Sequence, residues 1–219
     1  MVVAPVVDRI KPISSETAQD IADQEVNQHN PTFVTLDKYR AISETAEERL
    51  EYRDGEIFTM AGGSANHSAI AVNVTTTLNI TLRDTSCRVY NGDMRIWVPE
   101  FQCGTYADAL VINGKPEFNG DRTDEILNPL LIVEVLSPST EGYDRGEKFR
   151  KYRSIPSLAE YLLISQSEPY IEHYFKPENN DVWQFQTCDR LEQTMKLHSL
   201  NIEIPVSEIY RRIPFNEPQ

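Results

Sequence analysis

One stretch of the chain is aliphatic almost without interruption, from Leu130 to Leu136 in the sequence NPLLIVEVLSPST. Its length, its Ile and Val content and the flanking Asn-Pro and Ser-Pro predict a buried strand. Side chains alternate along a strand, so Ile132, Glu134 and Leu136 share one face. The polar residue, Glu134, therefore has no solvent-facing position, although an unpaired buried carboxylate is energetically costly. The pattern requires a partner for this carboxylate.

Hydrophobic periodicity along the rest of the chain predicts helices and strands in an irregular order. In the segment 64–84, His67, Ile70, Val74 and Leu78 recur at helical spacing. A helix, several strands, another helix and further strands favour an α/β sandwich over a regular βαβ series. The predicted helices cover 35–44, 64–84 and 144–155, and the predicted strands cover 49–53, 56–60, 87–90, 94–98, 108–112, 130–136, 159–165, 170–175, 181–187 and 196–204.

Two features set the limits of these elements. Asp54-Gly55 separates the first two strands and is a dipeptide that tight hairpins prefer. Residues 1–30 are polar and lack sustained apolar periodicity, so we expect a poorly structured N-terminal tail. The segment 31–215 is then expected to form a single domain of α/β (α+β) class.

Composition excludes several protein classes. The chain has 219 residues, of which 40% are hydrophobic, enough to bury a sizeable core. No apolar run approaches the roughly 20 residues that span a bilayer, so we expect no membrane segment. Cys87, Cys103 and Cys188 form no CxxC pair, which is typical of reduced thiols and favours a cytoplasmic protein.

The formal net charge of −13 bears on the choice of partner. A surface of this sign repels phosphate, so non-specific binding of nucleic acid should be poor unless the charge is locally segregated. Carboxylates gathered in a metal site also contribute to the total, so the charge alone does not decide the function.

Acidic residues carry the candidate chemistry, because the sequence has no Gly-rich phosphate loop, no G-x-S-x-G and no H-E-x-x-H. Asp108 stands at the start of one predicted strand, and Glu134 lies inside the next strong one. Two acids from neighbouring strands suit Mg²⁺, which takes one or two carboxylates together with waters and substrate phosphates. Asp108 is equally compatible with a turn residue at a strand entry. For Glu134 we favour a functional partner.

Lys148 is the third candidate residue. Asp144 and Glu147 have the D-x-x-E spacing of a capping box, which predicts a helix that begins near Asp144. Lys148 then falls in or just after the first turn, where the helix dipole disfavours a cation. One interpretation is a surface ion pair between Asp144 and Lys148. We favour the other, in which the lysine reaches the acids and stabilises developing charge or orients the attacking water.

At these residues the sequence resembles the Uma-type restriction endonuclease family, part of the PD-(D/E)xK nuclease superfamily. The resemblance covers residues 33 to about 175 and implies a restriction-endonuclease-like core, a central mixed β-sheet flanked by helices. The motifs that carry it are LEYRDGEIFTM, NHSAI, YADALVI, LLIVEVLSPST, DRGEKFRKY and EYLLI.

The resemblance also assigns roles to residues. It implies that Asp108, Glu134 and the backbone carbonyl of Val135 hold Mg²⁺ or Mn²⁺. The superfamily pattern places lysine where this chain has Leu136, and in this family Lys148 of the following helix matches that lysine. Ala107 replaces the proline that usually precedes the first acid, which changes turn rigidity more than metal chemistry.

Three further matches to the family are weaker. Tyr152 matches a family tyrosine and is also compatible with a packing residue. Glu56 follows the Asp-Gly turn and is either an additional metal ligand or, as we favour, a solvent-facing hairpin residue. His67 is a supporting candidate, although we favour a hydrogen-bonded core or cap histidine.

The leading hypothesis is thus a Mg²⁺-dependent endonuclease that cleaves nucleic acid, DNA before RNA, by metal-activated water, and that forms a homodimer. The alternative is a catalytically silent nuclease fold that serves in protein–protein or regulatory interactions, with the acids and the lysine as a structural ion-pair network. The charge of −13 favours this alternative. A glycosidase with paired carboxylates is a more distant possibility.

Overall fold

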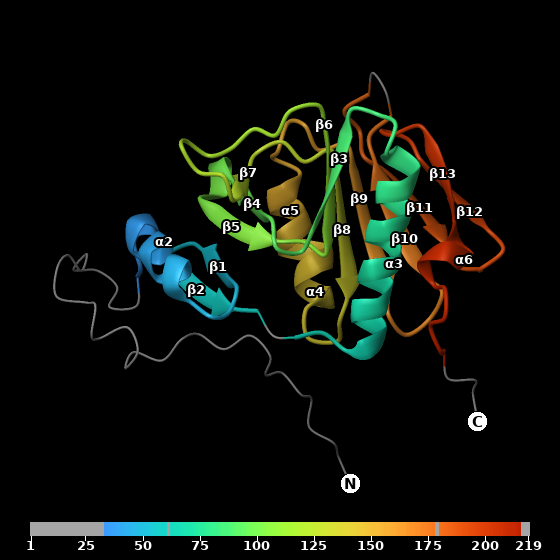
Figure 1. Ribbon diagram of the computed structural model, residues 1–219, viewed down its shortest axis with the longest axis horizontal. Helices are drawn as coiled ribbons and strands as arrows, with labels where there is room; N and C mark the ends of the chain where they lie inside the picture. Colours follow the sequence, from blue (N-terminus) through green and yellow to red (C-terminus); the bar gives the residue numbers. More distant parts are fainter. Residues whose placement is uncertain (1–32, 61, 178–179, 216–219) are drawn as a thin grey trace, which may run out of the picture.

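Most of the strands predicted from the sequence join in one six-stranded sheet (Figure 1). The fold is that of a computed structural model, which describes residues 33–60, 62–177 and 180–215. The tail predicted at 1–30 lies outside these described residues.

The six-stranded sheet is mixed, as predicted. Its strand order is β11-β10-β9-β8-β6-β3, with β8 and β9 parallel and the other neighbours antiparallel. The strands β8 and β9 are buried along their whole length and stand at its centre. Their nearly continuous apolar sequences are typical of strands that are covered on both faces. The strands are β3 (Cys87–Asn91), β6 (Ala109–Asn113), β8 (Leu131–Leu136), β9 (Glu160–Ser165), β10 (Ile171–Phe175) and β11 (Gln184–Cys188).

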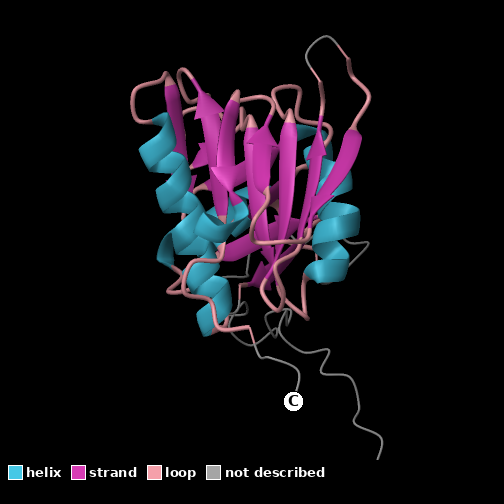
Figure 2. Cartoon of the chain, turned by 90° about the vertical axis from the view of Figure 1, so that its right-hand side faces the viewer, coloured by secondary structure: helices cyan, strands magenta, loops and turns pink. Residues whose placement is uncertain are grey.

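Helices cover both faces of this sheet (Figure 2). On one face lies α3 (Ala65–Leu82), which buries Ile70, Val74 and Leu78 in one core cluster with Val133 of β8. On the other face lies a helical segment whose Tyr152 packs in a second cluster. The segment consists of α4 (Glu141–Tyr143), the π-helical turn η3 (Asp144–Lys148) and α5 (Phe149–Tyr152).

A second sheet of five strands has the order β2-β1-β5-β4-β7. The hairpin predicted at Asp54-Gly55 is confirmed: both residues have positive φ, 51° and 87°, as a tight turn of this kind requires. Tyr39 of α2 (Leu36–Thr45) packs with Trp97 beside this sheet. The strands are β1 (Leu50–Arg53), β2 (Glu56–Thr59), β4 (Arg95–Val98), β5 (Cys103–Tyr106) and β7 (Glu125–Ile126).

Two strands of the second sheet were not predicted. The turn η2 (Pro99–Phe101) precedes β5, which contains Gly104, and β7 has two residues. Neither strand has the length or the apolar alternation that identifies a strand in a sequence.

The C-terminal part corrects one prediction. The single strand predicted over 196–204 is a hairpin of β12 (Thr194–Leu197) and β13 (Ile202–Pro205), followed by α6 (Val206–Ile209). The chain reverses at Asn201, whose φ of 50° lies in the left-handed region that asparagine tolerates. Among the described residues, no helix has the length and apolarity needed to cross a membrane.

Candidate active site

Strand β8 carries Glu134 on the face predicted from the sequence. Val133 and Val135 belong to the core cluster under α3, whereas Ile132 and Leu136 belong to the cluster under α5. Glu134 lies on the α5 side and is only 4% exposed. The predicted burial is therefore confirmed, and the neighbours of this carboxylate show what compensates for it.

Asp108 lies beside Glu134, immediately before β6 begins. Ala109 pairs with Val133 in the antiparallel ladder between β6 and β8, so the next position along places Asp108 opposite Glu134. The Val135 N–H donates a hydrogen bond to Asp108 Oδ2 at 2.6 Å, which fixes the carboxylate at the edge of β8. The Asp108 side chain remains 22% exposed and can be reached from solvent.

Lys148 reaches these acids from the helical segment after β8. Its Nζ lies 2.9 Å from Glu134 Oε1 and 3.6 Å from Asp144 Oδ1. It also donates a hydrogen bond to the Tyr106 carbonyl at 2.8 Å. The structure thus brings together Asp108, Glu134 and Lys148, the three residues that the sequence singled out, although they come from separate elements.

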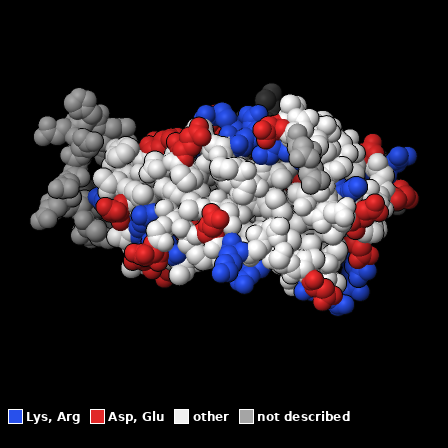
Figure 3. Space-filling view, turned by 90° about the horizontal axis from the view of Figure 1, so that it is seen from above, with Lys and Arg blue, Asp and Glu red and all other residues white. Residues whose placement is uncertain are grey.

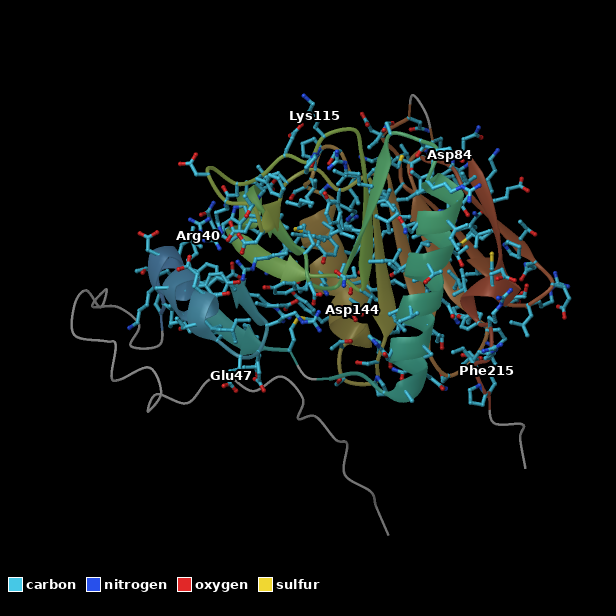
Figure 4. All side chains as sticks on the ribbon, viewed as in Figure 1. Arg40, Glu47, Asp84, Lys115, Asp144 and Phe215 are labelled. Atoms are coloured by element: carbon cyan, nitrogen blue, oxygen red, sulfur yellow. The ribbon has the colours of Figure 1, made fainter. Side chains whose placement is uncertain are left out.

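The helix that carries Lys148 does not begin near Asp144, so the capping-box prediction is wrong. α4 begins at Glu141, and the Asp144 N–H donates to the Thr140 carbonyl at 2.9 Å, inside the helical segment. The Asp144 carboxylate is buried beside Lys148 and does not cap the helix; Figure 4 shows this residue in the middle of the molecule, between the β1–β2 hairpin and α3. The π-helical turn of Asp144–Lys148 is a type of turn that is frequent at functional sites.

Glu51 of β1 is a site residue that the sequence analysis missed. It is 2% exposed, and its Oε1 lies 3.9 Å from Lys148 Nζ. Its Oε2 accepts a hydrogen bond from Arg53 Nε at 2.9 Å, and the Thr105 hydroxyl donates to Oε1. A single acid in a short alternating strand is normally solvent-facing, so only the pairing of β1 with the unpredicted β5 reveals its burial.

Glu56 and His67 occupy different positions relative to the cluster. Glu56 is exposed on β2 and does not line the cleft described below, so the structure does not bring it to the other acids. His67 lies in the first turn of α3, where its backbone N–H donates a hydrogen bond to the side chain of Ser64, the N-cap residue. Its Nε2 is 3.5 Å from Asp108 Oδ2, so the histidine borders the cluster in addition to its capping contact.

Two buried tyrosines hold the acids from the α5 side. The Tyr152 hydroxyl donates a hydrogen bond to Glu134 Oε1 at 3.1 Å, so this residue does more than fill space. The Tyr161 hydroxyl donates to the Asp144 carbonyl at 3.0 Å. These bonds fix Glu134 and the start of the π-helical turn relative to the sheet.

Carboxylates outnumber cations in this cluster. Burial raises the pKa of Glu134 well above its ordinary value, and the attraction of Lys148 does not cancel this effect. Burial also favours the neutral form of Glu51, but Lys148 and Arg53 hold the pKa of that carboxyl below its ordinary value. The four carboxylates are Glu51, Asp108, Glu134 and Asp144, and the two cationic side chains are Arg53 and Lys148. With all four carboxyl groups ionised, one divalent cation would balance the excess negative charge.

A cleft with a volume of about 840 Å³ opens onto the cluster. Residues of α3, of the β1–β2 hairpin and of the turn 137–140 line it, together with Asp108, Glu134 and Lys148. Ions and small molecules can therefore reach acids that are otherwise enclosed by the two sheets and the helices.

The donor set in the cleft fits a hard divalent cation. With the described residues, Asp108 uses Oδ2 and Glu134 uses Oε1 for hydrogen bonds, which leaves Asp108 Oδ1 and Glu134 Oε2 free. Those oxygens and the Val135 carbonyl suit Mg²⁺ or Mn²⁺, which retain part of their water shell. No group of three or more His, Cys, Asp or Glu residues in the described part of the chain could hold a metal by itself. The fit is thus to an ion whose remaining ligands are water or another bound molecule.

Comparison with known proteins relates the chain to a family. The profile of the family described as "Uma2: Putative restriction endonuclease" matches residues 36–207. The "Uncharacterized protein sll1609" of Synechocystis sp. is 40% identical over 144 residues, which are 66% of this chain and 81% of that protein. The "Uncharacterized protein slr1290" of the same organism is 39% identical over 193 residues, which are 85% of this chain and 98% of that protein.

A solved structure supports the fold. The crystal structure of "a putative nuclease belonging to DUF820" from Anabaena variabilis superposes with a TM-score of 0.65 and covers 81% of this chain and 97% of its own. At 17% sequence identity this likeness concerns the fold alone, and it confirms the predicted mixed α/β architecture. The match to the family profile and the two cyanobacterial relatives place the chain in a family as well: it belongs to the Uma2 family.

Proposed function

We propose that this chain is a Mg²⁺-dependent endonuclease that hydrolyses phosphodiester bonds of nucleic acid, DNA before RNA. The observation that carries the proposal is the meeting of Asp108, Glu134 and Lys148 at the floor of one cleft. Membership of the Uma2 family supports it, since the description of that family reads "Putative restriction endonuclease". Paired carboxylates and a nearby cation provide what hydrolysis of a phosphodiester needs: metal ligands and a counter-charge for the transition state.

Asp108, Glu134 and the Val135 carbonyl are the proposed ligands of Mg²⁺, or of Mn²⁺ in its place. A bound ion of this kind supplies Lewis acidity towards the phosphate and lowers the pKa of the attacking water. The protein holds Asp108 through the Val135 N–H and holds Glu134 through Tyr152, so both carboxylates are oriented before the ion arrives.

Lys148 is the proposed cation for the charge that develops on the phosphate. Burial alone would lower its pKa, but Glu134, Asp144 and Glu51 raise it well above the ordinary value. When Glu134 is protonated, the Glu51 carboxyl, whose pKa is lowered, still favours the ammonium form of Lys148. Contacts with Glu134 and the Tyr106 carbonyl fix its position. A charge fixed in advance stabilises the transition state without reorganisation at the moment of reaction.

A cleavage assay tests the proposal. Wild-type protein is incubated with single-stranded and double-stranded DNA and with RNA, with Mg²⁺, with Mn²⁺ or with EDTA. We expect metal-dependent cleavage, and Glu134→Ala or Lys148→Met should lower its rate by at least about a hundredfold. Glu56→Ala is the matched control, since this acid is exposed and lies outside the cleft, and it should cleave at the wild-type rate. Wild-type protein that cuts none of these substrates would refute the proposal.

The alternative function is that of a catalytically silent nuclease fold acting in protein–protein or regulatory interactions. One observation favours it: Lys148 is already engaged by Glu134, Asp144 and the Tyr106 carbonyl, as in a structural ion-pair network. In that case Glu134→Gln should lower the Tm, and Mg²⁺ should leave the wild-type Tm unchanged. The nuclease proposal expects Mg²⁺ to raise the wild-type Tm by binding to the folded state.

A further inference from the structure

We propose that Arg53 is the phosphate-binding residue of the cleft and that it donates a hydrogen bond to a non-bridging oxygen of a nucleic-acid phosphodiester. Arg53 lies at the end of β1, on the wall of the cleft, and no role was expected for it from the sequence. The proposal rests on the proposed function for the nature of its ligand, but phosphate binding can be measured without cleavage.

The Arg53 guanidinium is immobilised on three sides. Its Nε and Nη2 both donate hydrogen bonds to Glu51 Oε2. The rings of Phe58 and Tyr143 lie 4.7 Å and 3.8 Å from its central carbon. As a result, the side chain is only 13% exposed, and little conformational entropy remains to be lost when a ligand binds.

One edge of this guanidinium is left for a ligand. Arg53 Nη1 donates to none of the described residues. Within the described part of the chain, the Tyr143 hydroxyl is the sole buried side-chain nitrogen or oxygen atom without a hydrogen-bond partner. Nη1 is not among those fully buried atoms, so it keeps some contact with solvent, and Arg53 lines the cleft. A fixed, charged N–H donor at a cleft wall is suited to a phosphate oxygen.

A purely structural role explains less of this arrangement. Glu51 also has Lys148, the Thr105 hydroxyl and the Tyr106 N–H as partners, so its burial does not depend on Arg53 alone. A residue that served only as the counter-ion of Glu51 would need neither an N–H group without a partner among the described residues nor the rings of Phe58 and Tyr143 against its guanidinium.

A second arginine of the cleft has a different environment. Arg49 is 46% exposed at its side chain, and its Nη1 already donates to the Gly92 carbonyl and lies 3.6 Å from Asp93. The Arg53 side chain is less exposed, at 13%, and its Nη1 donates to none of the described residues. The formal net charge of −13 repels phosphate from the molecule as a whole, so a cation fixed at the site has to offset this repulsion locally.

Glu51 joins the proposed phosphate contact to the acidic cluster. One of its oxygens binds Arg53, and the other lies 3.9 Å from Lys148 Nζ. A phosphate on Arg53 would therefore lie at the same end of the cleft as Glu134 and Lys148. The substrate class that follows is a phosphodiester chain whose backbone, rather than its bases, is held by this residue.

The test measures binding in EDTA, where no metal is present, with a fluorescent single-stranded oligonucleotide in a salt series and, separately, with inorganic phosphate. Arg53→Met should weaken the binding of both ligands by at least about tenfold. It should also reduce, by about one, the slope of log affinity against log salt concentration for the oligonucleotide. Arg53→Lys keeps the charge beside Glu51 but loses the fork, so it should bind more weakly than wild type while its Tm stays close to the wild-type value. Arg150→Met, an exposed arginine outside this cleft, is the control and should bind as wild type.

The results of these measurements separate the possibilities. Wild-type affinity and salt slope in both Arg53 variants would overturn the inference, as would a wild-type protein that binds neither ligand. A wild-type protein that binds through Arg53 but cleaves nothing would sustain the inference and refute the endonuclease proposal. If Arg53→Met fails to fold, Arg53→Lys decides alone: equal affinity contradicts the inference, and weaker binding of both ligands supports it.

Discussion

Glu134 is a buried carboxyl group whose protonation depends on its surroundings. Lys148 and Tyr152 both bind its Oε1, whereas none of the described residues bonds to its Oε2, and the residue lines the cleft. Because burial raises its pKa well above the ordinary value of 4.5, the metal-free folded protein retains a proton that the unfolded chain releases. Above about pH 4.5 the folded state therefore binds more protons than the unfolded state, and stability falls as the pH rises towards the folded pKa.

Glu134→Gln isolates this effect, since glutamine does not titrate. In EDTA, the free energy of unfolding of wild type relative to Glu134→Gln should decline by about 1.4 kcal/mol for each pH unit between the two pKa values. Denaturant unfolding at several pH values from 5 to 8, roughly the range in which globular proteins are most stable, measures the difference.

Burial also raises the pKa of Asp144. Because this residue is present in both proteins, much of its contribution to the pH dependence cancels. A difference between wild type and Glu134→Gln that does not change with pH would contradict the account. Such a result would mean that Glu134 stays ionised and paired with Lys148, as the structural ion-pair network requires.

At the scale of elements, α3 serves the core and the cleft at once. Over its 18 residues the sequence has no Lys, Arg, Asp or Glu. Ile70, Val74 and Leu78 are fully buried on the side that faces the six-stranded sheet, whereas Val72 is 61% exposed. The stability contributed by this helix should therefore come from one face only.

Two substitutions on this helix test that division. Ile70→Ala should lower the free energy of unfolding by about 2–5 kcal/mol, because it removes buried methylene groups and leaves a cavity. Val72→Ala, two residues away, should change it by no more than about 0.5 kcal/mol. Denaturant unfolding gives both values, and similar losses at the two positions would show that α3 does not pack as described.

The elements predicted from the sequence are those whose pattern is local. The hairpin at Asp54-Gly55, the helix α3 and the central strands all carry periodic or continuous apolar residues. β5 and β7 depend on pairing with distant strands, and their short sequences contain no such pattern. The β12–β13 hairpin was missed because its turn, at Asn201, resembles a continuing alternation.

The residues of the candidate site also divide into those that the local sequence reveals and those that it does not. Glu134 could be singled out because a carboxylate in an aliphatic strand conflicts with its surroundings, and Asp108 and Lys148 followed from their positions around it. Glu51 and Arg53 could not, because their burial arises from the packing of β1 against β5 and of Tyr143 against Arg53. Such contacts join distant parts of the chain and leave no mark in the local sequence.

At the scale of the whole molecule, the acidic charge limits how nucleic acid can bind. On the face seen from above, groups of Lys and Arg lie among groups of Asp and Glu around the edge (Figure 3). With a formal net charge of −13, attraction to a polyanion must come from local sites such as the cleft and from cations bound there. A divalent ion at Asp108 and Glu134 would neutralise the excess negative charge of the cluster that lines the cleft.

Calorimetric titration of Mg²⁺ and Mn²⁺ into the metal-free protein tests this central claim most directly. Wild type should bind a divalent ion, and Asp108→Asn and Glu134→Gln should each weaken that binding by at least about tenfold, because each removes a charged ligand. Glu56→Gln, an acid outside the cleft, should bind as wild type does. A wild-type protein that binds neither ion, or Asp108 and Glu134 variants that bind as tightly as wild type, would contradict the account.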